Sequence, residues 1–347
     1  MNRRTFLATT TAAALGQFTR AADGERIRIA QLGTAHSHAA GKMEAIRALP
    51  ELYEVAGIAE PDEKRRAAAE KAAAFSGLIW RSEAELLADS TIRAVAVETT
   101  LADSARAALA AIRAGKHVHL DKPGAADHAE FRAMRNTAAE RGLTVQMGYM
   151  LRYNPAFELL FRAAREGWLG DITEIDASMG KLLPDSQLEK MRDYPGGGMF
   201  ELACHLVDAV VTLLGKPTAI HSFSKSTRRN GFPDNQLAVL EYPRATVTLR
   251  CNHGDPFGGP HRRFAVTGTK GAMEIQPLES GKGILRLTEP RGDFAKGETP
   301  LALKVPSDRY AGEFRDLARV IRGERKLAWD AAHDIAVHET ALRAAGA

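Results

Sequence analysis

Strand-like and helix-like segments alternate through the first half of this chain, and the alternation limits its fold more than any other feature. The predicted strands are short apolar runs at residues 27–32, 53–59, 94–97, 117–120 and 144–148. The predicted helices between them cover residues 39–49, 63–74, 104–114 and 126–141. Strands separated by helices at this spacing predict a doubly wound parallel sheet over residues 26–148.

The pattern changes after residue 149, where turns rich in Gly, Pro, Asn and Asp join strand-like runs. These runs cover residues 172–177, 218–224, 236–251, 263–268 and 284–287, and helices are predicted at 155–166, 200–214 and 310–321. A chain of 347 residues can bury two cores. The fold class is therefore predicted to be α/β, with a second, α+β domain over 149–347 that has a largely antiparallel sheet.

The first 22 residues have the pattern of an export signal. Residues 3–7 read Arg-Arg-Thr-Phe-Leu, the run at 8–15 is too short to span a membrane, and small residues follow at Ala21 and Ala22. Paired arginines before Phe-Leu resemble a twin-arginine signal. We expect the twin-arginine export machinery as a partner and a periplasmic location, with a cytoplasmic enzyme as the alternative and no stable membrane span.

Charge and cysteine content argue against two classes of protein. The net charge is +4, but the basic residues are spread along helical stretches, which does not favour a nucleic-acid partner. The two cysteines, Cys204 and Cys251, lack the spacing of a zinc site or redox pair. No metal site is expected.

The turn after the first strand predicts a dinucleotide site, because a strand that ends in glycine before a helix presents backbone N–H groups to a pyrophosphate. The sequence at 33–38 keeps only the first glycine of the G-x-G-x-x-G pattern. Glu60, at the end of the second strand, favours NAD through a ribose diol, although Arg65 and Arg66 leave NADP open. The candidate cofactor contacts are Gly33, Thr34, Ala35, His36, His38 and Glu60. Polar filling of a helix start is the alternative for the two histidines, and a solvated turn is the alternative for Glu60.

Residues 114–123, Ala-Gly-Lys-His-Val-His-Leu-Asp-Lys-Pro, form the most specific segment of the chain. With the stretches at 148–155 and 196–208, they resemble the glucose–fructose oxidoreductase, inositol dehydrogenase and rhizopine-catabolism (Gfo/Idh/MocA) family, from about Arg26 to the C-terminal end. Asp121 stands where that family has the glutamate of a Glu-Lys-Pro motif. The resemblance implies a Rossmann domain and a nicotinamide-dependent oxidoreductase that acts on sugars or polyols.

The resemblance also implies that Lys122 faces the substrate hydroxyl. A partly desolvated lysine at the carboxyl end of a parallel strand, beside a cationic nicotinamide, should have a lowered pKa and act as a general base. A surface ion pair with Asp121 is the alternative. Asp121 and Lys122 are also candidate cofactor contacts.

Glu201 and His205 are four residues apart on the predicted helix 200–214, so both side chains should lie on one face and meet the substrate. The resemblance implies that they are catalytic with Lys122, with Glu201 in place of the family's usual aspartate. A core histidine is the alternative for His205. Asp208 is expected to support His205 or a helix contact.

Other features complete or depart from the family pattern. Arg152 and Tyr153 follow the last parallel strand and are predicted to bind substrate at the domain junction. The family's Thr-Pro-Asn-x-x-His stretch is changed at 99–104, although Thr99 and Thr100 can still line the nicotinamide pocket. The second domain looks short. Whether it has an extended sheet that forms a homo-oligomer is therefore left open.

The predicted function is hydride transfer between nicotinamide and a secondary hydroxyl of a sugar or polyol, with Lys122 as base. The alternatives are a glycosidase or epimerase-type enzyme that oxidises its substrate transiently, and a non-catalytic sugar-binding protein. Export predicts that NAD or NADP is held tightly, because no nicotinamide pool exists outside the cytoplasm.

Overall fold

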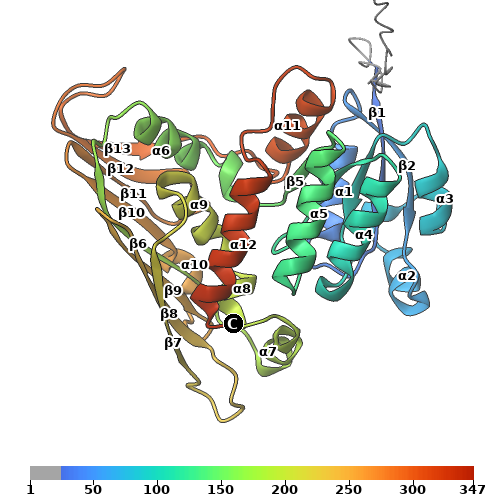
Figure 1. Ribbon diagram of the computed structural model, residues 1–347, viewed down its shortest axis with the longest axis horizontal. Helices are drawn as coiled ribbons and strands as arrows, with labels where there is room; N and C mark the ends of the chain where they lie inside the picture. The colour runs from blue at the N-terminus through green and yellow to red at the C-terminus, as the bar shows by residue number, and fades with distance from the viewer. Residues whose placement is uncertain (1–24) are drawn as a thin grey trace, which may run out of the picture.

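The computed structural model describes residues 25–347, so the predicted export signal at 1–22 lies outside the described residues. Two sheets stand apart in the ribbon, with helices between them (Figure 1). Within residues 25–347, no helix is both long enough and apolar enough to cross a membrane.

The first sheet confirms the predicted doubly wound arrangement. Its five strands run parallel in the order β2-β1-β3-β4-β5. They are β1 (Ile27–Leu32), β2 (Tyr53–Ala59), β3 (Ala94–Val97), β4 (His117–Leu120) and β5 (Val145–Met147). Since neighbouring strands are parallel, the residues that follow β1, β3 and β4 meet at one edge of the sheet.

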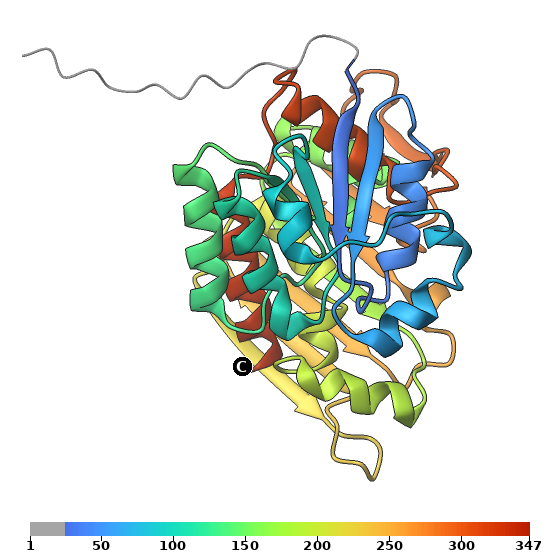
Figure 2. The ribbon, with the colours of Figure 1, turned by 90° about the vertical axis from the view of Figure 1, so that its right-hand side faces the viewer.

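Six helical segments connect these strands and flank the sheet (Figure 2). They are α1 (Ala39–Arg47), α2 (Glu63–Ala69), the 3₁₀ turn Ala73–Phe75, α3 (Glu83–Ala88), α4 (Leu101–Arg113) and α5 (His128–Glu140). Helix α4 begins three residues before the predicted start at Ser104, because Thr100 caps it by accepting a hydrogen bond from the Asp103 N–H.

The second sheet has eight strands in the order β13-β12-β11-β10-β6-β9-β8-β7. They are β6 (Ile172–Gly180), β7 (Ala219–Lys225), β8 (Asn235–Glu241), β9 (Thr246–Asn252), β10 (Arg263–Gly268), β11 (Gly271–Ile275), β12 (Lys282–Leu287) and β13 (Gly297–Ala302). Only β6 and β9 pair in parallel, which confirms a largely antiparallel sheet. The predicted strand 236–251 is two strands joined by a turn, and the sheet is more extended than the expected short second domain.

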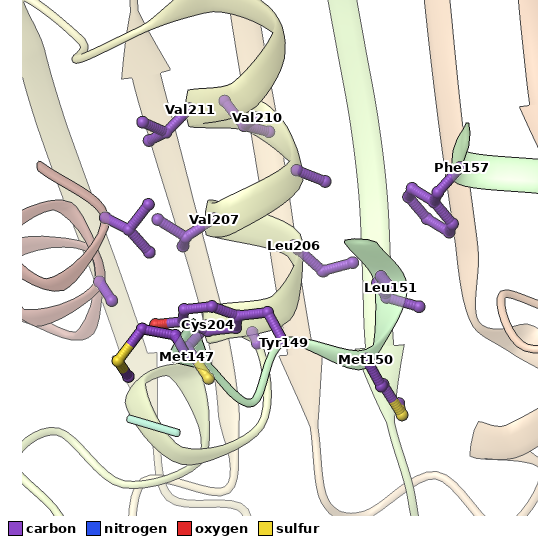
Figure 3. Packing of buried hydrophobic residues seen from close by; sticks show 14 of the residues in the cluster. Met147, Tyr149, Met150, Leu151, Phe157, Cys204, Leu206, Val207, Val210 and Val211 are labelled. Carbon is purple, nitrogen blue, oxygen red and sulfur yellow. The ribbon is translucent and has the colours of Figure 1, made fainter. Parts of the chain in front are cut away.

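Helices pack between the two sheets and enclose the main core. They include α6 (Pro155–Arg165), α9 (Cys204–Leu214) and α12 (Ala331–Ala345). Figure 3 shows Leu206 and Val207 of α9 close to the segment that follows β5, where Tyr149 and Leu151 are buried. Shorter helical segments are the 3₁₀ turns Met150–Tyr153 and Met191–Asp193, α7 (Asp185–Lys190), α8 (Gly198–Glu201) and α10 (Gly258–His261).

The predicted helix 200–214 is broken, which corrects one expectation about the site. Glu201 ends the short helix α8, whereas His205 lies in the first turn of α9. The two residues therefore do not share one continuous helical face. The intervening residues, Leu202 and Ala203, turn the chain between the two helices.

The C-terminal part of the chain returns to the first sheet. Helix α11 (Ala311–Ile321) packs with Phe314 and Leu317 in one cluster with Ile27 of β1. The Tyr53 hydroxyl donates a 2.6 Å hydrogen bond to the Phe314 carbonyl. A domain boundary at residue 148 stays a prediction, and α11 lies on the far side of it in sequence while packing against β1.

Candidate active site

Lys122 follows β4 at the carboxyl edge of the first sheet and is 2% exposed. Its peptide bond to Pro123 is cis. The Lys122 ammonium donates to the Glu201 carboxylate at 2.9 Å and to the Glu201 backbone carbonyl at 2.7 Å. The lysine therefore crosses from the first sheet to the end of α8 and pairs with Glu201, not with Asp121 at the surface.

The charges of this pair correct the expected state of Lys122. Burial opposes the charged amine, but the Glu201 carboxylate, together with Cys204 and Asp121, outweighs burial and raises the pKa of Lys122 above its ordinary value. Burial likewise opposes the Glu201 carboxylate, yet Lys122 lowers the pKa of Glu201 to about 2. Beside Glu201, Lys122 is therefore held in its protonated form, and its role as a general base stays a prediction.

His205 lies beside this pair, buried at 2% exposure. Among the described residues its Nδ1 has no hydrogen-bond partner, and its ring meets Tyr149 edge-on at 5.8 Å between centroids. Burial, helped by the charge of Lys122, lowers the pKa of His205 well below its usual range. A neutral imidazole with an unused nitrogen can donate or accept one further hydrogen bond.

A narrow hollow opens next to Lys122. It is lined by His36, Val97, Thr99, Leu101, Ser104, Asp121, Lys122, Pro123, Gly124 and Tyr194. Tyr194 was not predicted from the sequence, although an aromatic residue just before the glycine-rich entry 196–198 is a signal that could have found it.

A second hollow adjoins the first through Thr99. Its lining consists of Leu32, Gly33, Ala35, Ala59, Glu60, Pro61, Arg65, Glu83, Thr99, Thr100, Asp103 and Arg106. Gly33 has φ +86°, and a Cβ there would lie 2.8 Å from the Thr99 methyl and 2.9 Å from the Glu98 carbonyl. Only glycine fits this turn. The start of α1 has no side-chain cap, although the Ala39 N–H donates to the His36 carbonyl at 3.1 Å.

Glu60 is part of the site's structure and not a solvated turn residue, because it is 7% exposed. Its carboxylate accepts hydrogen bonds from the Thr34 N–H and hydroxyl, both at 2.8 Å, and from Arg65 at 3.0 Å. Glu60 therefore fixes the glycine turn, while Arg65 balances its charge.

The structure brings His36 and His38 to Asp121. The Asp121 Oδ2 lies 3.3 Å from the His36 Nδ1 and 3.0 Å from the His38 Nδ1. The other oxygen accepts the Lys122 N–H at 2.7 Å. Two histidines that were expected near a phosphate thus converge on a buried carboxylate.

Three further buried charges surround this group and were not predicted. Lys42 of α1 pairs with Glu313 of α11, and both are fully buried. Glu98 directly follows β3 and is fully buried, and neither of its carboxylate oxygens has a hydrogen-bond partner among residues 25–347. Its position at the end of a parallel strand is the sequence signal that could have found it.

Arg152 occupies a different network from the one expected. Its guanidinium donates to Asp208 at 2.7 Å and to Asp334 at 2.6 Å. His333 and Arg135 complete the two carboxylates' partners. Asp208 therefore supports Arg152 and not His205.

Arg152 and Tyr153 line a cavity of about 600 Å³ that is separate from the Lys122 hollow. The Tyr153 hydroxyl donates to Asp316 at 2.9 Å. The structure does not place either residue in the lining beside Lys122, so their predicted contact with substrate stays a prediction.

Comparison with known families agrees with this arrangement of strands and motifs. The family model described as "Oxidoreductase family, NAD-binding Rossmann fold" matches residues 27–149, and the model of the "GFO/IDH/MocA C-terminal domain" matches residues 157–274. The chain belongs to the Gfo/Idh/MocA family. This Gfo/Idh/MocA protein is accordingly an NAD(P)-dependent oxidoreductase of a family that includes sugar and polyol dehydrogenases.

Named relatives of this Gfo/Idh/MocA enzyme include the D-xylose 1-dehydrogenase (NADP(+)) 2 of Haloferax volcanii, 28% identical over 71% of this chain and 74% of the relative. The scyllo-inositol 2-dehydrogenase (NADP(+)) IolW of Bacillus subtilis is 26% identical over 69% of this chain and 72% of the relative. The WlbA dehydrogenase from Bordetella pertussis, solved with NADH and UDP-GlcNAcA, has the same fold. It has a TM-score of 0.79 and 19% identity over 93% of this chain and 96% of its own.

Proposed function

We propose that this Gfo/Idh/MocA enzyme catalyses reversible hydride transfer between a nicotinamide and a secondary hydroxyl of a sugar or polyol. One observation carries the proposal: the Lys122 ammonium, held 2.9 Å from Glu201, borders the hollow at the carboxyl edge of the parallel sheet. A proton donor and acceptor at this edge, next to two hollows that share Thr99, fits carbonyl and carbinol chemistry.

The residues present fit a dinucleotide. The Gly33 turn packs tightly against Thr99 and Glu98, where a Cβ would not fit, and it leads into the start of α1, which has no side-chain cap and would lie next to a pyrophosphate. Glu60 and Arg65 would lie at the adenosine end, while Thr99 joins this end to the hollow beside Lys122. Arg65 and Arg106 supply positive charge beside Glu60, so we expect NADP to be accepted as well as NAD.

Bound nicotinamide would supply or accept the hydride, and the chain's own residues would handle the proton. In the reduction direction, Lys122 would donate a proton from its Nζ to the substrate oxygen, and its raised pKa keeps it protonated before that step. In the oxidation direction, Lys122 must first lose its proton, which the charge of Glu201 opposes. The unused nitrogen of neutral His205 can orient the same hydroxyl.

The test is dinucleotide reduction with a panel of sugars and polyols, followed by the Lys122→Met variant. We expect the variant to lose about 10² to 10⁴-fold in kcat, the usual contribution of a positioned acid or base. Lys64→Met, at an exposed position of α2, is the control and should keep full activity. Full turnover by Lys122→Met would overturn the assignment of Lys122.

Product analysis separates net oxidation from transient oxidation. Net dehydrogenation yields one reduced dinucleotide for each oxidised sugar, whereas an enzyme of the glycosidase or epimerase type turns over without accumulating reduced cofactor. We expect the first result.

We also propose that the protein is exported with its dinucleotide bound, on the strength of the Arg3-Arg4 pair and the Ala-rich run that follows. A cofactor that cannot be replenished outside the cytoplasm must stay in place between turnovers. Mass spectrometry of native protein from the periplasmic fraction should detect one dinucleotide for each chain. Cytoplasmic accumulation, or a protein free of dinucleotide, would contradict this part of the proposal.

A further inference from the structure

Three potential metal-ligand atoms lie close together beside the Lys122 hollow. The His36 Nδ1, the His38 Nδ1 and the Asp121 Oδ2 all lie within 4.8 Å of one another. They come from the turn after β1 and the residue after β4, two segments that the parallel sheet brings to one edge. Two imidazole nitrogens and a carboxylate oxygen are ligand types that zinc and similar divalent metals bind.

The hydrogen bonds within the described residues do not satisfy every polar atom of His36, His38 and Asp121. The His38 N–H points at the His36 Nδ1 from 3.3 Å, which requires that nitrogen to present a lone pair. The same nitrogen faces the Asp121 Oδ2 at 3.3 Å and the Glu98 Oε2 at 3.6 Å. A lone pair directed at two carboxyl groups is favourable only if a proton or a metal ion lies between them.

The charged residues around His36, His38 and Asp121 also favour a bound cation. Three carboxylates, of Glu98, Asp121 and Glu313, lie near one buried lysine, Lys42, and all four residues are at most 4% exposed. Lys42 already pairs with Glu313. Glu98 and Asp121 are therefore left without a lysine or arginine partner among residues 25–347, and two adjacent buried carboxyl groups need a proton or a cation beside them.

Glu98 is the second, independent sign of a ligand. It is 0% exposed, and within residues 25–347 both of its carboxylate oxygens lack a hydrogen-bond partner, although Oε2 is close to His36. Buried polar atoms in native proteins almost always have a partner. A protonated Glu98 can make one hydrogen bond to Asp121, and a cation beside His36 would supply a partner for Oε2.

We infer that His36, His38 and Asp121 bind a divalent transition metal of the zinc type, with the Glu98 carboxylate at the edge of its coordination sphere. Metal–ligand bonds of about 2.0–2.1 Å in a tetrahedron place neighbouring ligand atoms about 3.3–3.4 Å apart. The separations of 3.0 and 3.3 Å from Asp121 to the two histidines are close to this spacing. The site goes beyond the proposed function, because hydride transfer to nicotinamide needs no metal.

The other group of His and Asp side chains in the described part of the chain has carboxylates that are already paired with arginines. Asp208, His333 and Asp334 also lie within 4.8 Å of one another. Their carboxylates, however, already bind Arg152 and Arg135, so the charges there are matched by the protein itself. The metal site is therefore assigned to the first group alone.

The placement explains the altered glycine pattern. His38 occupies the third glycine position of the G-x-G-x-x-G motif, at the N-cap of α1. The turn that usually serves only the dinucleotide would here also bind a metal, next to the hollow that Lys122 borders.

The test is Co²⁺ binding to full-length protein that has been stripped with a chelator. We expect one Co²⁺ for each chain, with the visible ligand-field bands of a four-coordinate nitrogen and oxygen site, and Zn²⁺ should displace it. His36→Gln and His38→Gln should each weaken binding at least about tenfold and remove or shift the bands, because each deletes a ligand. His221→Gln, at an exposed position on β7, is the matched control and should bind as the wild type does.

Folding of the variants is checked independently by thermal unfolding in chelator. Zn²⁺ should raise the Tm of the wild type and of His221→Gln, but not that of the two ligand variants, because only a folded site binds the ion. Wild-type protein that binds no stoichiometric Co²⁺, or His36→Gln and His38→Gln variants that bind it unchanged, would overturn the inference. Dinucleotide reduction is a separate measurement, so a metal-binding protein without dehydrogenase activity would contradict only the proposed function.

Discussion

Two buried clusters of charged residues lie in this molecule, and they differ in how completely their charges are matched. In the Arg152 cluster, Asp208 and Asp334 share Arg152, while Arg135 and His333 bind their remaining sides. In the Asp121 cluster, three carboxylates share Lys42 and two histidines whose pKa values are lowered, chiefly by burial. The first cluster joins helices, whereas the second lies at the carboxyl edge of the parallel sheet.

The comparison shows that burial of charge is not by itself a sign of function. A cluster whose positive and negative charges match one another stabilises the fold, and removing one member leaves an unpaired charge in an apolar interior. In a cluster with more carboxylates than cations, a proton, a metal ion or a cofactor is needed to balance the excess negative charge. The unmatched cluster is the one that adjoins Lys122.

The largest expected effect is on the matched cluster. Arg152→Met leaves Asp208 and Asp334 without their shared cation, and we expect a loss of about 3–5 kcal/mol in the free energy of unfolding. Urea unfolding followed by circular dichroism measures it. Arg66→Met is the control, since its pair with Glu70 is exposed and should contribute less than about 1 kcal/mol. If Arg152→Met and Arg66→Met lost the same free energy of unfolding, the Arg152 cluster would not be a stabilising, charge-matched cluster.

A smaller effect is expected at the Lys122 pair. Glu201→Gln removes the carboxylate that raises the pKa of Lys122, so Lys122 should lose its proton at lower pH. The rise of kcat/KM with pH in the oxidation direction should move down by roughly one to three pH units, the usual effect of an opposite charge at this distance. The measurement uses the sugar found in the substrate panel. An unchanged pH profile would show that Glu201 does not control Lys122.

Glu98 should give the smallest effect, visible as a pH dependence of stability in chelator. Burial, aided by Asp121, raises the pKa of Glu98 well above its ordinary value. The stability that its proton provides is complete below the ordinary carboxyl pKa and is lost as pH rises through the raised one. Glu98→Gln carries no titrating group there and should lose less stability between about pH 5 and about pH 8.

The size of this difference is about 1.4 kcal/mol for each unit of separation between the folded and unfolded pKa values of Glu98. It is measured as the shift in the urea midpoint of the two proteins at each pH. Identical pH dependence of wild type and Glu98→Gln would mean that the Asp121 cluster is as well matched as the Arg152 cluster.

The first sheet could be predicted closely from the sequence because its strands are buried on both faces and appear as continuous apolar runs. The predicted strand 94–97 coincides with β3, and its four residues are all buried. The second sheet has strands with one exposed face, such as β13, whose sequence contains Gly297 and Pro300 and gives little periodic signal. Helix α12 was also not predicted.

The site divides in the same way. Motif residues such as Gly33, Lys122 and His205 could be found because each lies in a recognisable local pattern. The pairing of Lys42 with Glu313 could not, because 271 residues separate the partners and neither has a local signal. Likewise, the broken helix between Glu201 and His205 depends on how α8 and α9 pack, which four-residue spacing does not reveal.

Helix α11 has a consequence for the order in which the protein can be made. It brings Glu313 to Lys42 and Phe314 against β1, and the ring of Tyr310, the residue before its first turn, has its centroid 4.2 Å from the Lys42 ammonium. A nascent chain that has completed the parallel sheet but ends before residue 313 has an unpaired lysine in place of its finished charge cluster. Glu313 is therefore synthesised only after all eight strands of the second sheet, so the charge cluster at the edge of the first sheet is completed last.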